Sequence, residues 1–368
     1  MLGLLAFLPT IVFIPHQVYL LLFPVLIWRN RTNMTEGIRT LLVDRDIKVN
    51  LNFIIILLFV IGALLNRIAH IELMFGLQDY FPFCLLILLT YWAGIGFKQQ
   101  DLKLIIYCVG IESLFVIAEY FMGVSTFFTG LELYTEFGDS QLMYARRPLG
   151  LSVNSSVAAV KLLLGYLLID YSKFKGVLIN VIRVLIIAAI VFTFNRSTMV
   201  ALVAYYLILA ARNFIKLKWP LKSVLFYSTI GLVGVALIGI ASYTYIDEIV
   251  SQFTRNQGSV ELSGREKIWE FYFKFISENF LYGNGSYKFW FGNYHAHNSY
   301  IQIVATHGVI LSLFYVVLII RGINKENIVY VFPILIYSLA QYGLFWGISL
   351  LDILFFVFLY GKGKEKEP

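Results

Sequence analysis

Long apolar runs alternate with short polar segments along almost the whole chain. A helix needs roughly 20 residues to cross about 30 Å of hydrocarbon, and eleven runs reach or approach that length. Pro9 and Pro15 in the first run predict a kink or a re-entrant piece there, and the last run is short, so we expect about 11 crossings within a range of about 10–12. The pattern predicts an all-α fold, a polytopic transmembrane helical bundle. The predicted spans cover residues 2–28, 49–66, 80–97, 102–122, 152–171, 177–194, 197–215, 223–245, 297–320, 328–345 and 347–360.

The longest polar break covers residues 246–296 and divides the chain into three parts. Residues 1–245 hold the first eight predicted spans, and residues 297–368 hold the last three together with a basic tail. The segment between them is too polar to cross a membrane. We therefore expect it to form a large loop outside the bilayer.

One amphipathic helix is predicted within this loop. Ser263 and Glu266 fit a capping box, in which a Ser hydroxyl and a Glu three residues later bind the first backbone N–H groups, so the helix is expected to start near Gly264. Apolar side chains then recur at helical spacing, and Gly283-Asn284-Gly285 is expected to end the helix. Two compatible arrangements fit this periodicity. The helix lies in the membrane interface with its apolar face down, or it covers the end of the bundle.

The composition supports a membrane protein and argues against other classes. Hydrophobic residues make up 59% of the chain and charged residues 14%, whereas soluble domains have about 45–50% and 25%. The formal net charge of +7 raises the question of nucleic acid binding. However, the basic residues are scattered through short loops, so membrane topology explains them better and no nucleic acid partner is expected.

The distribution of Lys and Arg predicts the orientation in the membrane. One alternate set of loops holds 18 basic residues and the opposite set holds nine, and the richer set is expected to face the cytoplasm. This orientation places the N-terminus and the loops 123–151 and 246–296 outside, and the C-terminus inside. The richer set consists of Arg29, Arg31, Arg39, Arg45, Lys48, Lys98, Lys103, Lys173, Lys175, Arg212, Lys216, Lys218, Lys222, Arg321, Lys325, Lys362, Lys364 and Lys366.

Two residues on the predicted outer side have properties suited to chemistry. Arg265 stands at the expected helix start, where acidic residues are usual, and an Arg beside free N–H groups forms an anion site. His297 lies where the chain re-enters the membrane and can exchange a proton near pH 7. Plainer readings stay open, because interfacial His is often only solvated and Arg at helix ends often reaches lipid headgroups. His295 with His297 is a weak metal signature without Cys partners, so no metal is expected.

Charged residues within predicted spans are expensive and usually face the interior of a bundle. Glu119 and Asp352 lie near the expected outer ends of their spans and can approach a site there. Lys161 and Arg183 are expected to pair with carboxylates, and Glu112 lies in the same span as Glu119. None of the five is assigned a catalytic role.

Several short motifs follow one another in a fixed order on the predicted outer side. In order and spacing they resemble the bacterial O-antigen polymerase and ligase superfamily, most strongly from about Gly264 to Leu311. Each motif alone is weakly specific, and the rest of the chain matches only as hydrophobic spans. The motifs are Arg147-Pro148-Leu149-Gly150 through Asn154, Asn195-Arg196-Ser197, Ser263-Gly264-Arg265 with Ile268-Trp269, Gly283-Asn284-Gly285, His297-Asn298-Ser299-Tyr300 and Gly308.

The resemblance implies roles for the matching residues. By similarity, Arg196 and Arg265 bind the pyrophosphate of a lipid-linked donor, because fixed guanidinium charges suit a diphosphate. His297 acts by similarity as the general base on the acceptor sugar hydroxyl.

Three further residues complete the expected site. Arg147 is an additional anion-binding candidate, with Arg146 as its neighbour, and Asn298 is a substrate-binding candidate beside the base. The chain has no acidic cluster suited to a divalent metal, so we expect no cofactor and a metal-independent, inverting glycosyltransferase.

The resemblance implies a surface polysaccharide polymerase. Such an enzyme transfers glycan from undecaprenyl pyrophosphate to a lipid-linked repeat unit at the outer face of the bacterial cytoplasmic membrane. The close alternative is an O-antigen ligase, which transfers finished glycan to lipid A core. In the ligase-like pattern a small residue or Tyr stands three positions after the Gly, whereas this chain has Leu311 three positions after Gly308, which favours a polymerase.

A third alternative is a flippase or transporter of lipid-linked glycans. Transporters usually show repeated halves and a site at mid-membrane, whereas the candidate residues here lie outside and the halves look unlike. The expected partners are undecaprenyl-pyrophosphate-linked oligosaccharides, the lipid bilayer, a chain-length regulator and a flippase.

Overall fold

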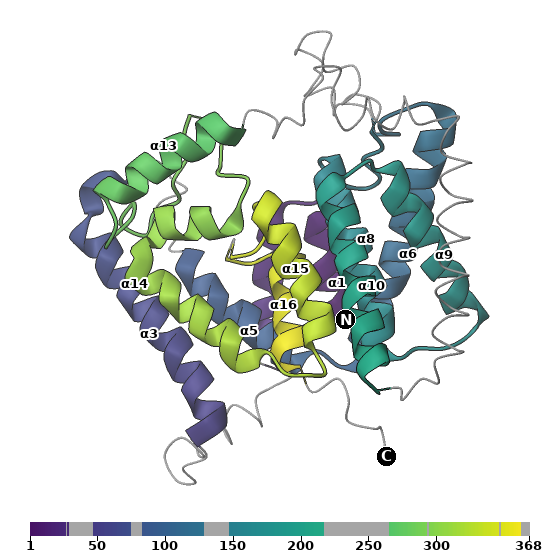
Figure 1. The fold of residues 1–368 in the computed structure, drawn as a ribbon, viewed down its shortest axis with the longest axis horizontal. Coiled ribbons are helices and arrows are strands. Elements are labelled where there is room, and N and C mark those ends of the chain that lie inside the picture. Colours follow the sequence, from purple (N-terminus) through teal and green to yellow (C-terminus); the bar gives the residue numbers. More distant parts are fainter. Residues whose placement is uncertain are drawn as a thin grey trace.

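The computed structural model describes residues 1–26, 28, 47–74, 83–128, 147–216, 265–292, 294–345 and 347–361. Within these ranges the chain forms helices and no β-strand, which confirms the expected all-α class (Figure 1). Several predicted features lie outside the described residues, namely Arg146, the span 223–245, the capping residue Ser263 and the basic tail. The helices are α1 (Leu2–Phe7), α3 (Ile47–Ala69), α5 (Leu86–Gly96), α6 (Gln99–Met122), α8 (Ser155–Ser172), α9 (Val177–Phe192), α10 (Arg196–Lys216), α13 (Arg265–Glu278), α14 (Ser299–Gly322), α15 (Ile328–Ala340) and α16 (Leu350–Tyr360).

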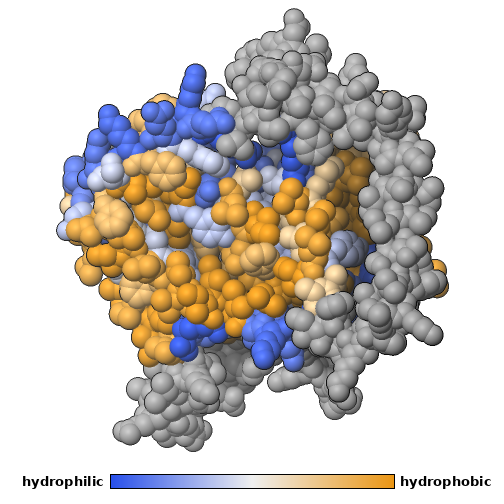
Figure 2. Space-filling view, viewed as in Figure 1, coloured by the Kyte–Doolittle hydropathy of each residue, from blue (hydrophilic) through white to orange (hydrophobic). Residues whose placement is uncertain are grey.

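Four of the described helices are long and apolar enough to cross a membrane, namely α3 from Leu51, α6, α8 and α14. Shorter apolar helices, among them α5, α9, α15 and α16, accompany them. Figure 2 shows apolar side chains in a broad band across one face, between polar side chains at the α13 end and a smaller polar group at the opposite end. Such a band is what a helical membrane protein presents to lipid. The expected total of about 11 spans stays a prediction.

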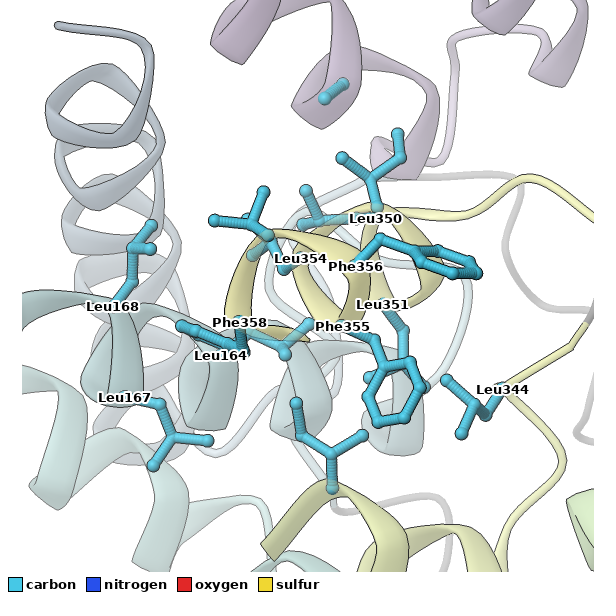
Figure 3. Packing of buried hydrophobic residues seen from close by; sticks show 14 of the residues in the cluster. Leu164, Leu167, Leu168, Leu344, Leu350, Leu351, Leu354, Phe355, Phe356 and Phe358 are labelled. Carbon is cyan, nitrogen blue, oxygen red and sulfur yellow. The ribbon is translucent and has the colours of Figure 1, made fainter. Parts of the chain in front are cut away.

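The interior of the bundle is built around α16. Every residue from Leu350 to Leu359 in this helix is buried, as expected for a helix that is apolar on all sides. Figure 3 shows Leu354 and Phe358 of α16 beside Leu164 and Leu168 of α8. Gly94 of α5 lies against the backbone of α16, where an added Cβ would stand 2.5 Å from Phe356 Cβ. α16 thus holds the two sides of the described bundle together.

The first apolar run is broken as its prolines predict, and it turns back inside the protein. The Met1 amino group lies 3.3 Å from the Asp101 carboxylate at the start of α6, and Val12 N–H donates to the Leu151 carbonyl. The Thr10 carbonyl accepts from the Lys161 ammonium at 3.4 Å. Protein groups therefore satisfy the backbone at the break, as non-helical backbone within a membrane requires.

This path corrects one expectation about topology. Asp101 lies beside the Lys98 turn, which the charge distribution assigns to the cytoplasm. Met1 lies at the same turn, so the expectation that the N-terminus and the Lys98 turn lie on opposite sides of the bundle is wrong. Which of the two sides faces the cytoplasm stays a prediction. A run of 27 residues with three prolines reads as one crossing from hydropathy alone, because hydropathy carries no information on a reversal.

The helix α14 is sharply broken at Gly308, whose φ of 75° and ψ of 171° are not helical. The break leaves carbonyls without their helical partners, and the loop after α13 supplies new ones. Asn284 N–H donates to the Ala305 carbonyl at 2.8 Å and Ser286 N–H donates to the Thr306 carbonyl at 2.9 Å. In return, Val309 N–H donates to the Phe280 carbonyl at 2.9 Å.

The loop of residues 279–287 therefore acts as a strap that fits into the break of α14. α13 ends at Glu278, earlier than Gly283-Asn284-Gly285, so the expectation that these glycines end the helix is wrong. Their role is contact: a Cβ on Gly283 would lie 2.5 Å from Gly308 N, and one on Gly308 would lie 2.0 Å from the Leu281 carbonyl oxygen.

The predicted amphipathic helix forms as α13 and begins at Arg265, next to the expected start. Its apolar face packs on the first half of α14, where Tyr272 is buried with Ala296 and Ala305. Figure 1 shows α13 lying across one end of the bundle above this half-helix. The arrangement in which the helix covers the bundle end is confirmed, whereas contact with the membrane interface stays a prediction.

Candidate functional site

The C-terminal end of α15 gathers residues from two other helices. Arg265 of α13 donates from its guanidinium to the Ala340 carbonyl at 2.7 Å. Asn298 donates to the Leu339 carbonyl at 2.9 Å, and Ser299 Oγ donates to the Gln341 carbonyl at 3.0 Å. The last carbonyls of a helix lack helical partners and carry partial negative charge, so a cation and two donors are suited to this position. The end of α15 thus holds Arg265 close to the start of α14.

His297 occupies a strained turn directly before α14. Its φ is 49°, a left-handed conformation that is uncommon for residues other than glycine. Its backbone N–H donates to Nδ1 of His295 at 3.1 Å, and the two imidazole centroids are 4.2 Å apart. Because Nδ1 of His295 accepts this bond, neutral His295 carries its proton on Nε2. The turn presents the two imidazoles as one unit.

Side chains on α13 and α14 fix this turn. The Trp269 indole donates to the Ala296 carbonyl at 2.7 Å. Gln302 accepts from Ala296 N–H at 2.8 Å and from the Tyr272 hydroxyl at 3.1 Å, and its amide donates to the Phe289 carbonyl at 2.6 Å. The sequence interpretation did not include Gln302. The sequence did contain a sign of its role, because Gln302 is an amide within an apolar run. Amides within a membrane usually form hydrogen bonds to neighbouring segments.

The environment keeps both imidazoles neutral. Burial and the positive charge of Arg265 lower the pKa of His297 to about 4. Burial, His297 and Arg265 lower the pKa of His295 to about 3. A neutral imidazole has a nitrogen lone pair and can accept a proton, so at pH 7 His297 is in the form that a general base requires.

A second group of residues lies where α8 and α10 begin. Burial and, as the smaller cause, the positive charge of Arg196 lower the pKa of Arg147 to about 10. Asn195 accepts from Thr198 N–H at 3.0 Å, as a helix cap does, and donates to Ser156 Oγ at 3.0 Å. This second bond ties the start of α10, and with it Arg196, to the first turn of α8.

A tyrosine of α15 connects the two groups. The Tyr337 hydroxyl donates to the Ser156 carbonyl at 3.3 Å, and the same phenol interacts electrostatically with Arg265. Ser156 is the residue that Asn195 contacts. Ser156 therefore contacts both Tyr337 and Asn195, the residue before Arg196. The sequence interpretation missed Tyr337, because a Tyr in an apolar span carries no local sign of its neighbours.

The predicted site residues thus fall into two linked groups. Arg265, His297 and Asn298 meet at the end of α15, and Arg147 and Arg196 meet at the start of α8 and α10. Asn298 has a structural use, since its side-chain oxygen accepts from Tyr300 N–H at 2.9 Å and Ile301 N–H at 3.1 Å. Substrate binding by Asn298 stays a prediction, as do the roles of the other four residues.

The remaining charges behave mostly as partners of one another. Lys161 pairs with Glu112 at 2.8 Å and Arg183 pairs with Asp170 at 2.6 Å, which confirms that these cations pair with carboxylates. Asp352 accepts from Phe345 N–H at 2.6 Å and from Ser349 Oγ at 2.8 Å at the start of α16. Across the described ranges, no three His, Cys, Asp or Glu residues are grouped as a metal site.

The fold and the site together define a helical membrane protein with arginines and an imidazole pair at one end of its bundle. A family model described as O-antigen ligase matches residues 181–316, which supports membership of the O-antigen polymerase and ligase superfamily. The matched region contains Arg196, Arg265 and His297, whereas Arg147 precedes it. No match was found among curated proteins or solved structures.

Proposed function

We propose that this protein is a surface polysaccharide polymerase, acting on O-antigen, capsule or exopolysaccharide. It transfers a growing glycan from undecaprenyl pyrophosphate to a lipid-linked repeat unit at the outer face of the bacterial cytoplasmic membrane. The observation that carries the proposal is the meeting of Arg265 with neutral His297 at the end of α15, connected to Arg196 through Tyr337 and Ser156. Membership of a family of glycosyl-transferring enzymes supports it.

The chemistry follows from the residue types. His297 takes the proton of the acceptor hydroxyl as its oxygen forms a bond with the anomeric carbon of the donor glycan. The bond from that carbon to the diphosphate oxygen breaks, and undecaprenyl diphosphate leaves with the electron pair. Arg196, Arg265 and Arg147 neutralise the charge that accumulates on the diphosphate. A single displacement by the hydroxyl inverts the anomeric centre and needs no metal ion.

Binding of the donor also prepares the base. Arg265 contributes to the low pKa of His297, and a diphosphate bound at Arg265 offsets that positive charge. The pKa of His297 then rises towards its ordinary value of about 6.5. A base with a pKa nearer the working pH accepts a proton more effectively, so the hydroxyl is activated chiefly when the donor is present.

An O-antigen ligase is the second candidate, and the description of the matching family favours it. Leu311 is the residue that departs from the ligase-like pattern. It packs on α3, where an added Cβ on Gly62 would lie 2.7 Å from Leu311 Cδ2. The departure therefore stands at a helix contact away from His297, and it supports the polymerase only through the family pattern.

The deciding experiment incubates the purified protein with one defined undecaprenyl-pyrophosphate-linked repeat unit and separates the products by size. A ladder of increasing length supports the polymerase. A protein that leaves the repeat unit unextended but joins long lipid-linked glycan to lipid A core is a ligase. If the protein in liposomes moves the lipid-linked unit between leaflets and extends nothing, it is a flippase and the enzyme proposal fails.

A further inference from the structure

The segment of residues 149–152 is held deep in the bundle by two carboxylates of α6. Glu119 accepts from Leu149 N–H at 3.0 Å and Gly150 N–H at 2.6 Å through one oxygen, and from Phe127 N–H at 3.2 Å through the other. Glu112 accepts from Leu151 N–H at 3.2 Å and from Ser152 Oγ at 2.8 Å. These hydrogen bonds fix a stretch of backbone that forms no regular secondary structure.

The spacing of the two carboxylates fits this task. Glu112 and Glu119 stand seven residues apart on α6, about two turns or roughly 10 Å, and both are fully buried. The Lys161 ammonium lies 2.8 Å from Glu112 and neutralises it. Glu119 is used differently, because both of its oxygens receive backbone N–H groups. Buried carboxylates with such donors form strong, charge-assisted hydrogen bonds.

A rigid residue, Pro148, connects Arg147 to this fixed segment. Only Pro148 separates Arg147 from Leu149, and the proline ring fixes one backbone angle and offers no N–H. Gly150 leaves no freedom on the other side, since its φ is 58° and a Cβ there would lie 2.8 Å from the Glu112 carboxylate. The position of the Arg147 backbone is therefore set by the contact between Glu119 and the two residues that follow Pro148.

We propose that Glu119 is a positioning residue for Arg147, holding the backbone of residues 149–150 so that the Arg147 guanidinium keeps its place for binding a diphosphate. The proposal rests on the proposed function in one respect, the assignment of Arg147 as a diphosphate ligand. Glu119 acts through its hydrogen bonds to Leu149 N–H and Gly150 N–H, which fix the backbone two and three residues after Arg147.

Glu119→Gln is the sharpest test, because it keeps the size of the side chain. Glutamine has one acceptor oxygen, so either Phe127 N–H or the pair from Leu149 and Gly150 faces an NH₂ group instead. Losing hydrogen bonds from Leu149 and Gly150 releases the backbone that positions Arg147. We expect the affinity for the diphosphate to fall roughly 10-fold to 100-fold.

The measurement is the binding of free undecaprenyl diphosphate to the purified full-length protein in detergent, without any transfer reaction. Wild type, Glu119→Gln, Arg147→Ala and the double variant form a cycle. We expect the double variant to bind no more weakly than Arg147→Ala, because Glu119 acts through Arg147. Glu326→Gln, at an exposed position of the α14–α15 connection, is the control that keeps wild-type affinity.

Additive losses in the cycle, or wild-type affinity in Glu119→Gln or in Arg147→Ala, would overturn the proposal. If Glu119→Gln does not fold, as judged by size-exclusion chromatography and thermal unfolding, Gly150→Ala displaces the same segment from the Glu112 side and should weaken binding alike. Wild-type affinity in folded Gly150→Ala also contradicts the proposal. The binding measurement needs no turnover. A protein that binds the diphosphate but never extends glycan would therefore refute the polymerase, and the role of Glu119 in binding could still be measured.

Discussion

At the scale of single residues, the proposed chemistry depends on how His297 is held. A left-handed turn at a residue other than glycine is costly, and here Trp269 and Gln302 fix the carbonyl and the N–H of the preceding residue, Ala296. The strained backbone of His297 thus fixes the orientation of its imidazole. Arg265 stands close enough to lower its pKa, and this pairing of a base with a cation suits a reaction in which a hydroxyl attacks a carbon attached to an anion.

Replacing His297 by glutamine removes the base and keeps a side chain of similar length. We expect glycan extension to fall roughly 10²-fold to 10⁴-fold, the usual contribution of a general base. Binding of undecaprenyl diphosphate should change little, because the arginines remain. Initial rates of ladder formation and the binding assay on the same preparation check both points. Full activity in a His297→Gln protein of normal stability would remove His297 from the mechanism.

Arg265 makes the acid–base behaviour of His297 testable. The pKa of His297 is about 4, with burial as the larger cause and Arg265 as the smaller one. In Arg265→Gln the positive charge is gone, so the pKa rises but stays below about 6.5 because burial persists. Only neutral imidazole reacts with diethyl pyrocarbonate, so the modification rate of His297 falls as pH drops through its pKa.

We therefore expect the pH of half-maximal modification to be higher in Arg265→Gln than in wild type. Peptide mass spectrometry separates His297 from His295 on the same turn. Arg321→Gln, in the last turn of α14, should leave the profile unchanged. An unchanged profile in Arg265→Gln would mean that burial alone sets the pKa.

At the scale of elements, the ends of helices determine the site. Asn154, Asn195 and Asn298 cap α8, α10 and α14, and each accepts backbone N–H groups of the first turn. The positive ends of these helices therefore lie on the side that carries the arginines, where an anion is favoured. The C-terminal end of α15 is directed to the same place, and Arg265 occupies it.

The break in α14 can be tested with two matched glycine substitutions. Gly308 and Gly176 both have backbone angles that essentially only glycine adopts, with φ of 75° and 132° and ψ of 171° and 160°, so a Cβ adds backbone strain of about 1–3 kcal/mol at either. At Gly308 the Cβ also collides with the Leu281 carbonyl oxygen at 2.0 Å, whereas at Gly176 nothing lies within 4 Å. We expect Gly308→Ala to lower thermal stability in detergent clearly more than Gly176→Ala.

The difference between the two variants isolates the contact between the strap and the break. Gly308→Ala should also reduce glycan extension, since His297 directly precedes the half-helix that the strap holds. Equal unfolding temperatures for the two proteins would show that the strap does not depend on the absence of a Cβ at position 308.

At the scale of the whole molecule, the sequence predicts the helices better than it predicts the contacts between them. Periodicity predicted the amphipathic helix α13 correctly, because the signal is local. The strap was missed, because Gly283 and Gly308 acquire their meaning only when two segments touch. Tyr337 was missed for the same reason. Arg265 and His297 were found from their places at a helix start and at the re-entry into the membrane, and the family pattern added their roles. The contact between residues as distant as Ser156 and Tyr337 could not be predicted from either.

The orientation of the whole molecule in the membrane gives the last prediction. Glu278 ends α13 on the side of the candidate site, and Glu326 lies in the connection at the opposite end, with both exposed. In a background lacking the two native cysteines, Cys84 and Cys108, a cysteine at 278 should react with a membrane-impermeant maleimide added to intact spheroplasts. A cysteine at 326 should react only after permeabilisation, because positively charged loops stay in the cytoplasm. The reverse pattern would place the arginines and His297 inside the cell, where a polymer built for export would be on the wrong side, and it would contradict the proposed function together with the orientation.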